Sequence, residues 1–226
     1  MRINIGKGLT FPTADPNGVT KFIVGSVFSF FSFLLLPVFI SMGYYMETVR
    51  QASEGEDRML PDWSRWGEYG LAGFKGFLIS LVYMLPAIAI AVIGGFSSLV
   101  AVMGGARQES AGLAVAGTGA LLASFGAAGL VGIICTFILP MVMVRFARSG
   151  RMGDAFNVGG IFADIMVAPL DYLITWGVPI GLSIVGNVVL GMTGVGLFLT
   201  PAFTFYVAMV NAHLFGQYYR SHLTDR

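Results

Sequence analysis

Long apolar runs without a charged side chain dominate the chain and predict membrane-spanning helices. The uncharged runs cover Phe22–Met46, Gly76–Ala106, Ser110–Val144 and Tyr172–Tyr219. A span needs about 20 residues at about 1.5 Å each, so the first three runs hold one helix each and the last folds back to hold two. We therefore predict an all-α membrane protein, one polytopic domain over residues 1–226. Its five transmembrane helices are expected at Val19–Met46, Lys75–Met103, Ala111–Phe146, Ala168–Leu190 and Val195–Arg220.

Polar residues gather in three places: an N-terminal segment (1–18) and two elbows between helices (51–74 and 147–167). In the first elbow Asp62 can cap a helix that starts at Trp63. Helical spacing places Trp63, Trp66, Phe74 and Phe77 on one face. Tryptophan prefers the headgroup boundary, where an apolar ring and a polar N–H are both accommodated. The elbow is therefore predicted to be an interfacial helix that lies on the membrane before the chain enters at Lys75. It serves either as an anchor or, through Arg65 and Glu68, as a docking surface for another protein.

The two elbows resemble each other in sequence. The same spacing separates Trp63 from Pro86 and Phe156 from Pro179, and the tripeptide before Pro37 resembles the one before Pro140. This pattern suggests two parallel helix–elbow–helix repeats followed by a final helix.

Basic residues are unevenly distributed between the two sides that five spans define. One side holds Arg50, Arg58, Arg65, Lys75, Arg145, Arg148, Arg151, Arg220 and Arg226; the other holds Arg2, Lys7, Lys21 and Arg107. The excess predicts cytoplasmic elbows and a cytoplasmic C-terminus in the cell inner (cytoplasmic) membrane, with the N-terminus outside. If the first helix is instead a re-entrant pair broken at Pro37, the N-terminus is also cytoplasmic.

Composition agrees with a membrane protein and gives no sign of chemistry. Charged residues make up 11% of the chain, far below the quarter typical of soluble domains. A net charge of +1 argues against a nucleic-acid partner. Neither a nucleophile–base motif nor a metal cluster is visible, and the single cysteine, Cys135, has no pair. We therefore expect a protein that is not an enzyme and has no cofactor.

Small residues and prolines mark the predicted spans. Every fourth residue in the third span is small: Gly112, Ala116, Ala120, Ser124, Ala128 and Gly132. Such rows let helix backbones approach closely, within one chain or between subunits. Each span also holds one proline that can kink it: Pro37, Pro86, Pro140, Pro179 and Pro201. Broken helices build transporter sites, although prolines are also frequent in ordinary membrane helices.

Few strongly polar side chains lie within the spans: Asn187, Asn211, His213 and Gln217. Gln217 lies four residues after His213, on the same helix face. A buried membrane histidine can bind haem or a pigment, so His213 is a weak candidate for cofactor binding. The simpler interpretation is a hydrogen-bonded packing residue.

Three blocks resemble an uncharacterised prokaryotic membrane-protein family known only as a domain of unknown function. They are the segment from Gly43 to Pro86, GRMGDAF from Gly150 and AHLFGQYYR from Ala212. The best-matching residues are Gly43, Pro61, Trp63, Trp66, Gly67, Gly73, Lys75, Pro86, Ala155, Phe156, Gly216 and Tyr218. The resemblance implies an integral membrane protein with architectural, not catalytic, common residues.

These observations favour an accessory or scaffold subunit whose partners are the lipid bilayer and other membrane proteins. The alternative is a small permease with proline-broken helices. A water-filled cavity near Asn187 and Asn211 would favour transport, whereas a filled core would favour a scaffold.

Overall fold

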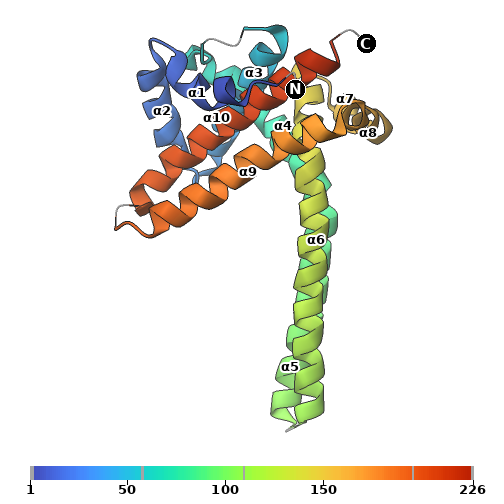
Figure 1. Cartoon of the computed structure of the whole chain (residues 1–226). Coiled ribbons are helices and arrows are strands. Elements are labelled where there is room, and N and C mark those ends of the chain that lie inside the picture. Colours follow the sequence, from blue (N-terminus) through green and yellow to red (C-terminus); the bar gives the residue numbers. More distant parts are fainter. Residues whose placement is uncertain (1–2, 57–58, 109, 195, 225–226) are drawn as a thin grey trace. The chain divides into compact units, whose positions relative to one another are not determined.

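The computed structural model describes residues 3–56, 59–108, 110–194 and 196–224, and these fold into helices without a strand (Figure 1). The chain forms two compact units. The first comprises Met1–Leu78 and Pro140–Arg226, and the second comprises Ile79–Leu139. The all-α membrane fold predicted from the sequence is confirmed.

The first unit begins with three helices: α1 (Ile5–Ala14), α2 (Gly18–Phe30) and α3 (Leu35–Glu54). The predicted first span, Val19–Met46, is therefore wrong as a single helix, because the chain leaves helical geometry between α2 and α3. The break lies before Pro37, not at it. Pro37 falls in the first turn of α3, where its missing N–H would have no helical partner anyway. Pro37 thus marks a helix start instead of a kink.

The helix that follows the first elbow is longer than expected. A 3₁₀ turn at Trp63–Arg65 leads directly into α4 (Trp66–Ala89), which continues through a π-helical turn (Ile90–Gly94) into α5 (Gly95–Arg107). The predicted change of direction at Lys75 is absent, since α4 is unbroken there. The π turn lies shortly after Pro86, which cannot donate a backbone hydrogen bond to the preceding turn.

The remaining helices are α6 (Ala111–Ser149), α7 (Met152–Ala155), α8 (Val158–Val167), α9 (Pro169–Gly191) and α10 (Gly196–His222). Of these, α6, α9 and α10 agree closely with predicted spans, whereas α7 and α8 lie in the predicted second elbow. Gly150, with a positive φ of 66°, ends α6, and Gly55, with φ 97°, ends α3.

Among the described residues, four helices are long and apolar enough to cross a membrane, one fewer than predicted. They are Trp63–Arg107, Ala111–Ser149, Pro169–Gly191 and Phe198–His222. The missing span is the first one, because α2 has 13 residues and is too short to cross.

The two proposed repeats differ in secondary structure. Between Trp63 and Pro86 the chain is one continuous helical stretch, whereas between Phe156 and Pro179 it breaks at Ala168. Likewise Pro37 lies in the first turn of a helix while Pro140 lies inside one. The matching letters therefore reflect similar composition in apolar segments.

Helix α10 forms the centre of the first unit. Helices α1, α2, α3 and α9 all pack against it (Figure 1). Every residue from Ala212 to Tyr218 is buried, so this part of α10 is covered on all sides.

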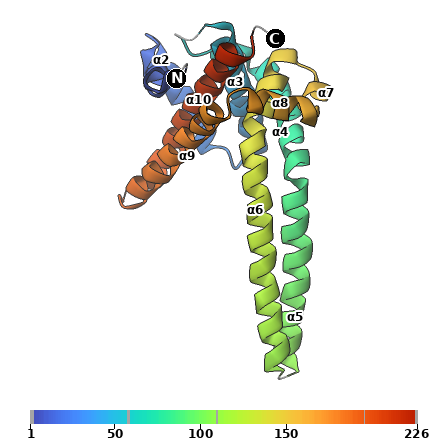
Figure 2. The ribbon, with the colours of Figure 1, turned by 45° about the vertical axis from the view of Figure 1, so that its right-hand side comes forward.

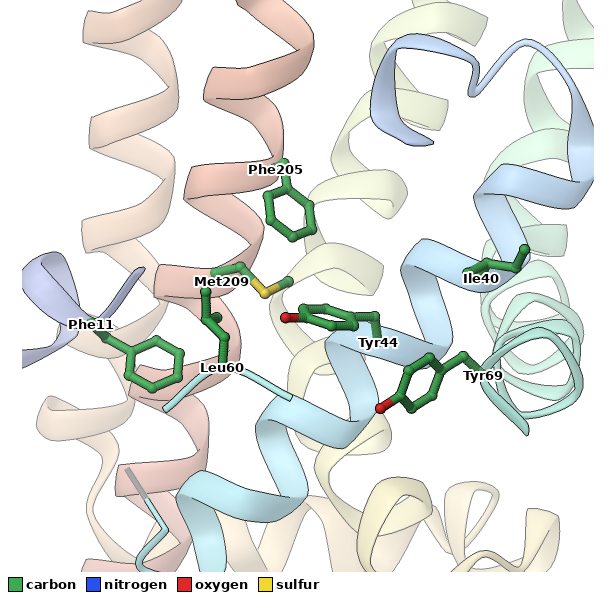
Figure 3. Close-up of a cluster of buried hydrophobic side chains, with 7 residues drawn as sticks. All are labelled: Phe11, Ile40, Tyr44, Leu60, Tyr69, Phe205 and Met209. Atoms are coloured by element: carbon green, nitrogen blue, oxygen red, sulfur yellow. The ribbon is translucent and has the colours of Figure 1, made fainter. Parts of the chain in front are cut away.

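The core beside α10 is rich in aromatic side chains (Figure 3). The ring of Tyr44 lies 3.9 Å from that of Trp63 in a parallel stack, and 5.7 and 5.8 Å from the rings of Tyr69 and Phe205. Such ring pairs each add about 0.5–1.5 kcal/mol beyond the area they bury. These contacts join α3, α4 and α10.

Glycines allow α3 to approach its neighbours at backbone distance. A Cβ atom at Gly73 of α4 would collide with the carbonyl of Phe39, and one at Gly43 of α3 with the backbone of Tyr69. On α10, a Cβ at Gly216 would lie 2.9 Å from the carbonyl oxygen of Val49. These three glycines belong to the residues that carry the family resemblance, and their positions agree with an architectural role.

The second unit is a helical hairpin in which α5 and α6 run side by side (Figure 2). A Cβ at Gly117 of α6 would lie 2.7 Å from the backbone nitrogen of Val102 of α5, and one at Gly105 would collide with the backbone of Ala114. Large apolar side chains cover the outside of both arms; among them are Val92, Ile93, Phe96, Val115, Leu122 and Ile134.

Candidate functional site

The two asparagines singled out in the sequence line one groove. Asn187 of α9 and Asn211 of α10 face it together with Tyr45 of α3, and its volume is about 450 Å³. Apolar side chains form most of the remaining wall, including Ile180, Phe203 and Val207. The ring of Phe203 packs directly against Gly186, where a Cβ atom would collide with the ring.

Both asparagines of this groove make a hydrogen bond within the protein. The Tyr45 hydroxyl donates to Oδ1 of Asn211 at 2.7 Å, and Nδ2 of Asn187 donates to the Ser183 carbonyl at 2.8 Å. Neither asparagine can act as a base or nucleophile. Because most of its wall is apolar, the groove can hold an apolar or amphiphilic molecule, which the amide groups can orient by hydrogen bonds.

His213, the candidate for cofactor binding, is completely buried in the first unit. Its ring stacks on Phe11 of α1 with centroids 4.2 Å apart, and its Nδ1 lies 3.0 Å from Nε2 of Gln217. The expected contact with Gln217 is therefore present. The second histidine, His222, lies 3.2 Å from Asp171. Since nine residues turn a helix by about 180°, the two histidines face opposite sides of α10 and cannot share one metal.

The tryptophans of the first elbow occupy different environments. Trp63 is half-buried: it stacks between Tyr44 and Phe28, and its Nε1–H donates to the Lys21 carbonyl at 2.9 Å. Trp66 is 58% exposed and meets only the edge of Phe28 among the described rings. Asp62 does not cap the turn at Trp63 with its side chain; it pairs instead with Lys21 at 3.2 Å. Phe74 packs edge-on against Phe39.

Arg65 and Glu68 belong to an ion-pair network with α3. Arg65 bridges Glu68 at 3.2 Å and Glu47 at 2.6 Å, and Glu47 also accepts from Arg50 at 2.7 Å. Burial alone would raise the pKa of Glu47, but the hydrogen bonds from the two arginines outweigh it and hold the pKa below its usual value. The arginine proposed for docking is thus already committed to a partly buried carboxylate.

The predicted row of small residues only partly faces the neighbouring helix. Ser124 and Ala128 lie on the packed side, whereas Gly112, Ala116 and Ala120 are exposed, and a Cβ at Gly112 or Gly132 would touch nothing within 4 Å. The reason is geometric: a step of four residues advances about 40° beyond one helical turn, so the row winds around α6. The close contacts with α5 come from Ala114 and Gly117.

Four of the five prolines lie inside helices that remain continuous. They are Pro86 in α4, Pro140 in α6, Pro179 in α9 and Pro201 in α10. Of these, Pro179 also lines the groove with Asn187 and Asn211.

The buried ion pair of the N-terminal segment was not predicted from the sequence. Asp15 accepts from Lys21 Nζ at 3.0 Å and from the backbone nitrogens of Asn17 and Leu60 at 2.8 and 3.0 Å, with its side chain 2% exposed. At the other end of this segment, the backbone nitrogen of Asn4 donates to Gln217 at 2.9 Å. The N-terminal segment, which was predicted only to be polar, is therefore a folded part of the first unit. Lys21 and Asn17 lie close to Asp15 in the sequence, but the contacts that fold the segment onto the rest of the unit, with Leu60 and Gln217, are remote, so no local pattern could have revealed them.

Across residues 3–56, 59–108, 110–194 and 196–224, no group of three His, Cys, Asp or Glu side chains is arranged to hold a metal ion.

Comparison with known families gives one match. The model of a family described as "Protein of unknown function (DUF4013)" matches residues 27–212, which is most of the chain. No curated protein and no solved structure shows a significant match.

Proposed function

The chain belongs to the DUF4013 family of proteins of unknown function, and from that premise we propose that it is a non-enzymatic accessory or scaffold subunit of a larger membrane complex. Its helices long enough to span a bilayer identify it as a membrane protein. The scaffold role rests on the surface of the hairpin formed by residues 79–139.

The observation that carries the proposal is the exposed part of the small-residue row on α6. Ala116 and Ala120 are exposed, and a Cβ at the nearby Gly119 would touch nothing within 4 Å. In a bilayer, helices associate through close packing of small residues because lipid tails offer no hydrophobic driving force. A helix of another subunit can therefore approach the α6 backbone along this face.

Lateral packing is tested by enlarging one residue of the row. With tagged full-length protein extracted in mild detergent, we expect co-purifying membrane proteins to be lost in Ala120→Leu. Thr118→Leu is the matched control, because Thr118 is also exposed but lies about 160° away around the helix.

Both variants should keep the thermal stability of the wild type, since neither side chain is buried. Retention of the same co-purifying proteins by Ala120→Leu would mean that this face contacts only lipid.

The second candidate function is a small permease, and the groove at Asn187 and Asn211 favours it. Its volume of about 450 Å³ is enough for a small molecule. Water access distinguishes the two functions. In a Cys135→Ala background, Asn187→Cys should react with a small membrane-impermeant thiol reagent from both sides if the groove belongs to a transport path, and from neither side if it faces lipid.

The side of the membrane is also a proposal, and the fold strengthens the charge argument. Asn4, Asp15 and Lys21 contact Gln217, Leu60 and Asp62, so the N-terminal segment lies on the side of the first elbow and the C-terminus. These contacts support the re-entrant alternative, in which the N-terminus is also cytoplasmic. Lys7 and Lys21 then join the basic side, whereas Arg107 ends α5 in the other unit. This distribution supports a cytoplasmic location for both termini and both elbows in a prokaryotic inner membrane.

A further inference from the structure

A separate pocket lies where the break between α2 and α3 meets the first turns of α10. Its volume is about 300 Å³, at the lower end of the range for small-molecule pockets. It is called the hydroxyl pocket here because five hydroxyl side chains line it: Ser29, Ser32, Ser41, Thr200 and Thr204. The rest of its wall is apolar, and none of its lining residues carries a charge.

The Ser41 hydroxyl is buried in the wall of this pocket without a partner. Its Oγ atom is inaccessible to solvent and forms no hydrogen bond with any described residue. Burying a hydroxyl without a hydrogen bond costs free energy, so such groups are rare in folded proteins. We therefore expect Ser41 to bond to a molecule that is not part of the chain.

Most of the other hydroxyls of the pocket are also left without a protein partner. A serine or threonine inside a helix can bond to the carbonyl one turn earlier, as Ser26 of α2 does at 2.7 Å. Within the pocket Thr200 does so, at 2.8 Å. Among the described residues, no group accepts from or donates to the side chains of Ser29, Ser32 and Thr204. The pocket thus concentrates hydroxyl groups that can bond to a ligand.

The composition of the lining selects a neutral ligand. A charged molecule would lose its hydration in the pocket without meeting an opposite charge, which is costly. A hydroxyl group both donates and accepts hydrogen bonds, so hydroxyls of the ligand can pair with hydroxyls of the wall in either sense. The carbon chain of a polyol can contact the apolar side chains of Val38 and Pro201, which complete the lining.

We propose that the hydroxyl pocket binds a small neutral polyol of the glycerol type. The hydroxyls of Ser41 on α3 and Thr204 on α10 bond to the hydroxyl groups of this ligand. Thr204 also lines the groove of Asn187 and Asn211, so the pocket and the groove adjoin. The inference concerns binding alone and needs neither the scaffold nor the permease function.

Saturation-transfer NMR of the full-length protein in phospholipid nanodiscs, with glycerol as the probe, tests the site. The wild type should give a saturable glycerol signal. Ser41→Ala and Thr204→Val should each weaken the affinity about fivefold, the effect of losing one neutral hydrogen bond. Ser26→Ala is the matched control and should change nothing, because Ser26 bonds to the Phe22 carbonyl and does not line the pocket.

A second arm identifies the source of the ligand, since the glycerol unit is also the headgroup of a monoacylglycerol. Loss of the glycerol signal after monoolein is added to the nanodiscs would show that the lipid carries the group that the pocket recognises. An unchanged signal would show that the pocket takes the free solute.

Thermal unfolding without glycerol separates a ligand site from a structural role. Because the Ser41 hydroxyl has no protein partner, Ser41→Ala should unfold at the same temperature as the wild type or at a higher one. Two results would overturn the proposal. One is equal glycerol affinity of the wild type, Ser41→Ala and Thr204→Val, which would mean that the pocket holds only water. The other is binding of glycerol 3-phosphate as tightly as glycerol, which an uncharged pocket does not allow.

Discussion

At the scale of single residues, the two tryptophans of the first elbow should behave differently. Trp63 is stacked on Tyr44 at 3.9 Å and hydrogen-bonded to the Lys21 carbonyl, whereas Trp66 is mostly exposed. We expect Trp63→Ala to lower the free energy of unfolding by about 3 kcal/mol and Trp66→Ala by less than about 1 kcal/mol. Trp63→Phe keeps the stack but loses the donor, so it should fall between them. Thermal unfolding in detergent measures all three, and equal losses for both alanine variants would point to a shared anchoring role at the membrane surface.

The ion pair of Asp15 predicts how stability depends on pH. Burial opposes its ionisation, but the hydrogen bonds from Lys21 and from the backbone nitrogen of Asn17 outweigh it and lower the pKa of Asp15 below its ordinary value of 3.8. A carboxylate whose pKa is lower in the folded than in the unfolded state stabilises the fold at any pH above its unfolded-state pKa. This stabilisation is lost as the pH falls through the folded-state pKa. Unfolding measured from pH 7 down to pH 3 should therefore show an acid-dependent loss below about pH 4 that is smaller in Asp15→Asn, where only other carboxylates such as Glu47 contribute.

The variant Asp62→Asn provides the control for this pair. Asp62 also pairs with Lys21, but its side chain is 78% exposed, so we expect its loss to cost less than about 1 kcal/mol. Asp15→Asn should cost about 3 kcal/mol at neutral pH because it leaves a partly buried ammonium without its main partner. Equal effects of the two substitutions would mean that burial of Asp15 does not matter.

At the scale of helices, the hairpin offers two glycines of opposite character. A Cβ at Gly117 would press on the backbone of Val102, whereas one at Gly119 meets nothing within 4 Å. Gly117→Ala should therefore destabilise the hairpin by about 1–3 kcal/mol, and Gly119→Ala should be neutral or stabilise it by about 0.5–1 kcal/mol through helix propensity. Thermal unfolding of the two variants decides whether α5 and α6 are packed in this register; a loss with Gly119→Ala but not with Gly117→Ala would contradict it.

Helix positions could be predicted well from the sequence where charged residues, glycine and proline bound an uncharged run. That is why α6, α9 and α10 begin and end within a few residues of expectation. The break between α2 and α3 has a weaker marker, because Phe31 to Leu34 carry no charge, glycine or proline. Pro37 in the first turn of α3 indicated a break nearby but not its position.

The candidate sites were predictable only in part for the same reason. Asn187 and Asn211 stood out because polar side chains are rare in apolar runs, and they do line one groove. By contrast, Arg148 of α6 contacts Ser53 and the ring of Tyr219, which are remote from it in sequence. Local spacing carries no information about such contacts.

At the scale of the whole molecule, the side of the membrane can be tested by cysteine labelling. In a Cys135→Ala background, single cysteines at Glu56, Ser149 and Thr224 are suitable because all three positions are exposed, whereas Ser53 is buried. We expect an impermeant thiol reagent to label them only after the membrane is opened. A cysteine at Arg107 on the hairpin tip should be labelled in intact cells, and the reverse pattern would show that the protein has the opposite orientation.

The outward-facing apolar side chains of the hairpin form a band whose length can be compared with the thickness of a bilayer. They run from Leu81 to Met103 on one arm and from Leu113 to Ile134 on the other, about 33 Å at 1.5 Å per residue. The hydrocarbon core of a typical bilayer is about 30 Å thick, so the hairpin matches it with little tilt. In a thinner bilayer the same band would be too long, and the hairpin would have to tilt or stretch the surrounding lipid. Hydrophobic mismatch thus makes this unit sensitive to membrane thickness, and a partner that packs on α6 would experience the same constraint.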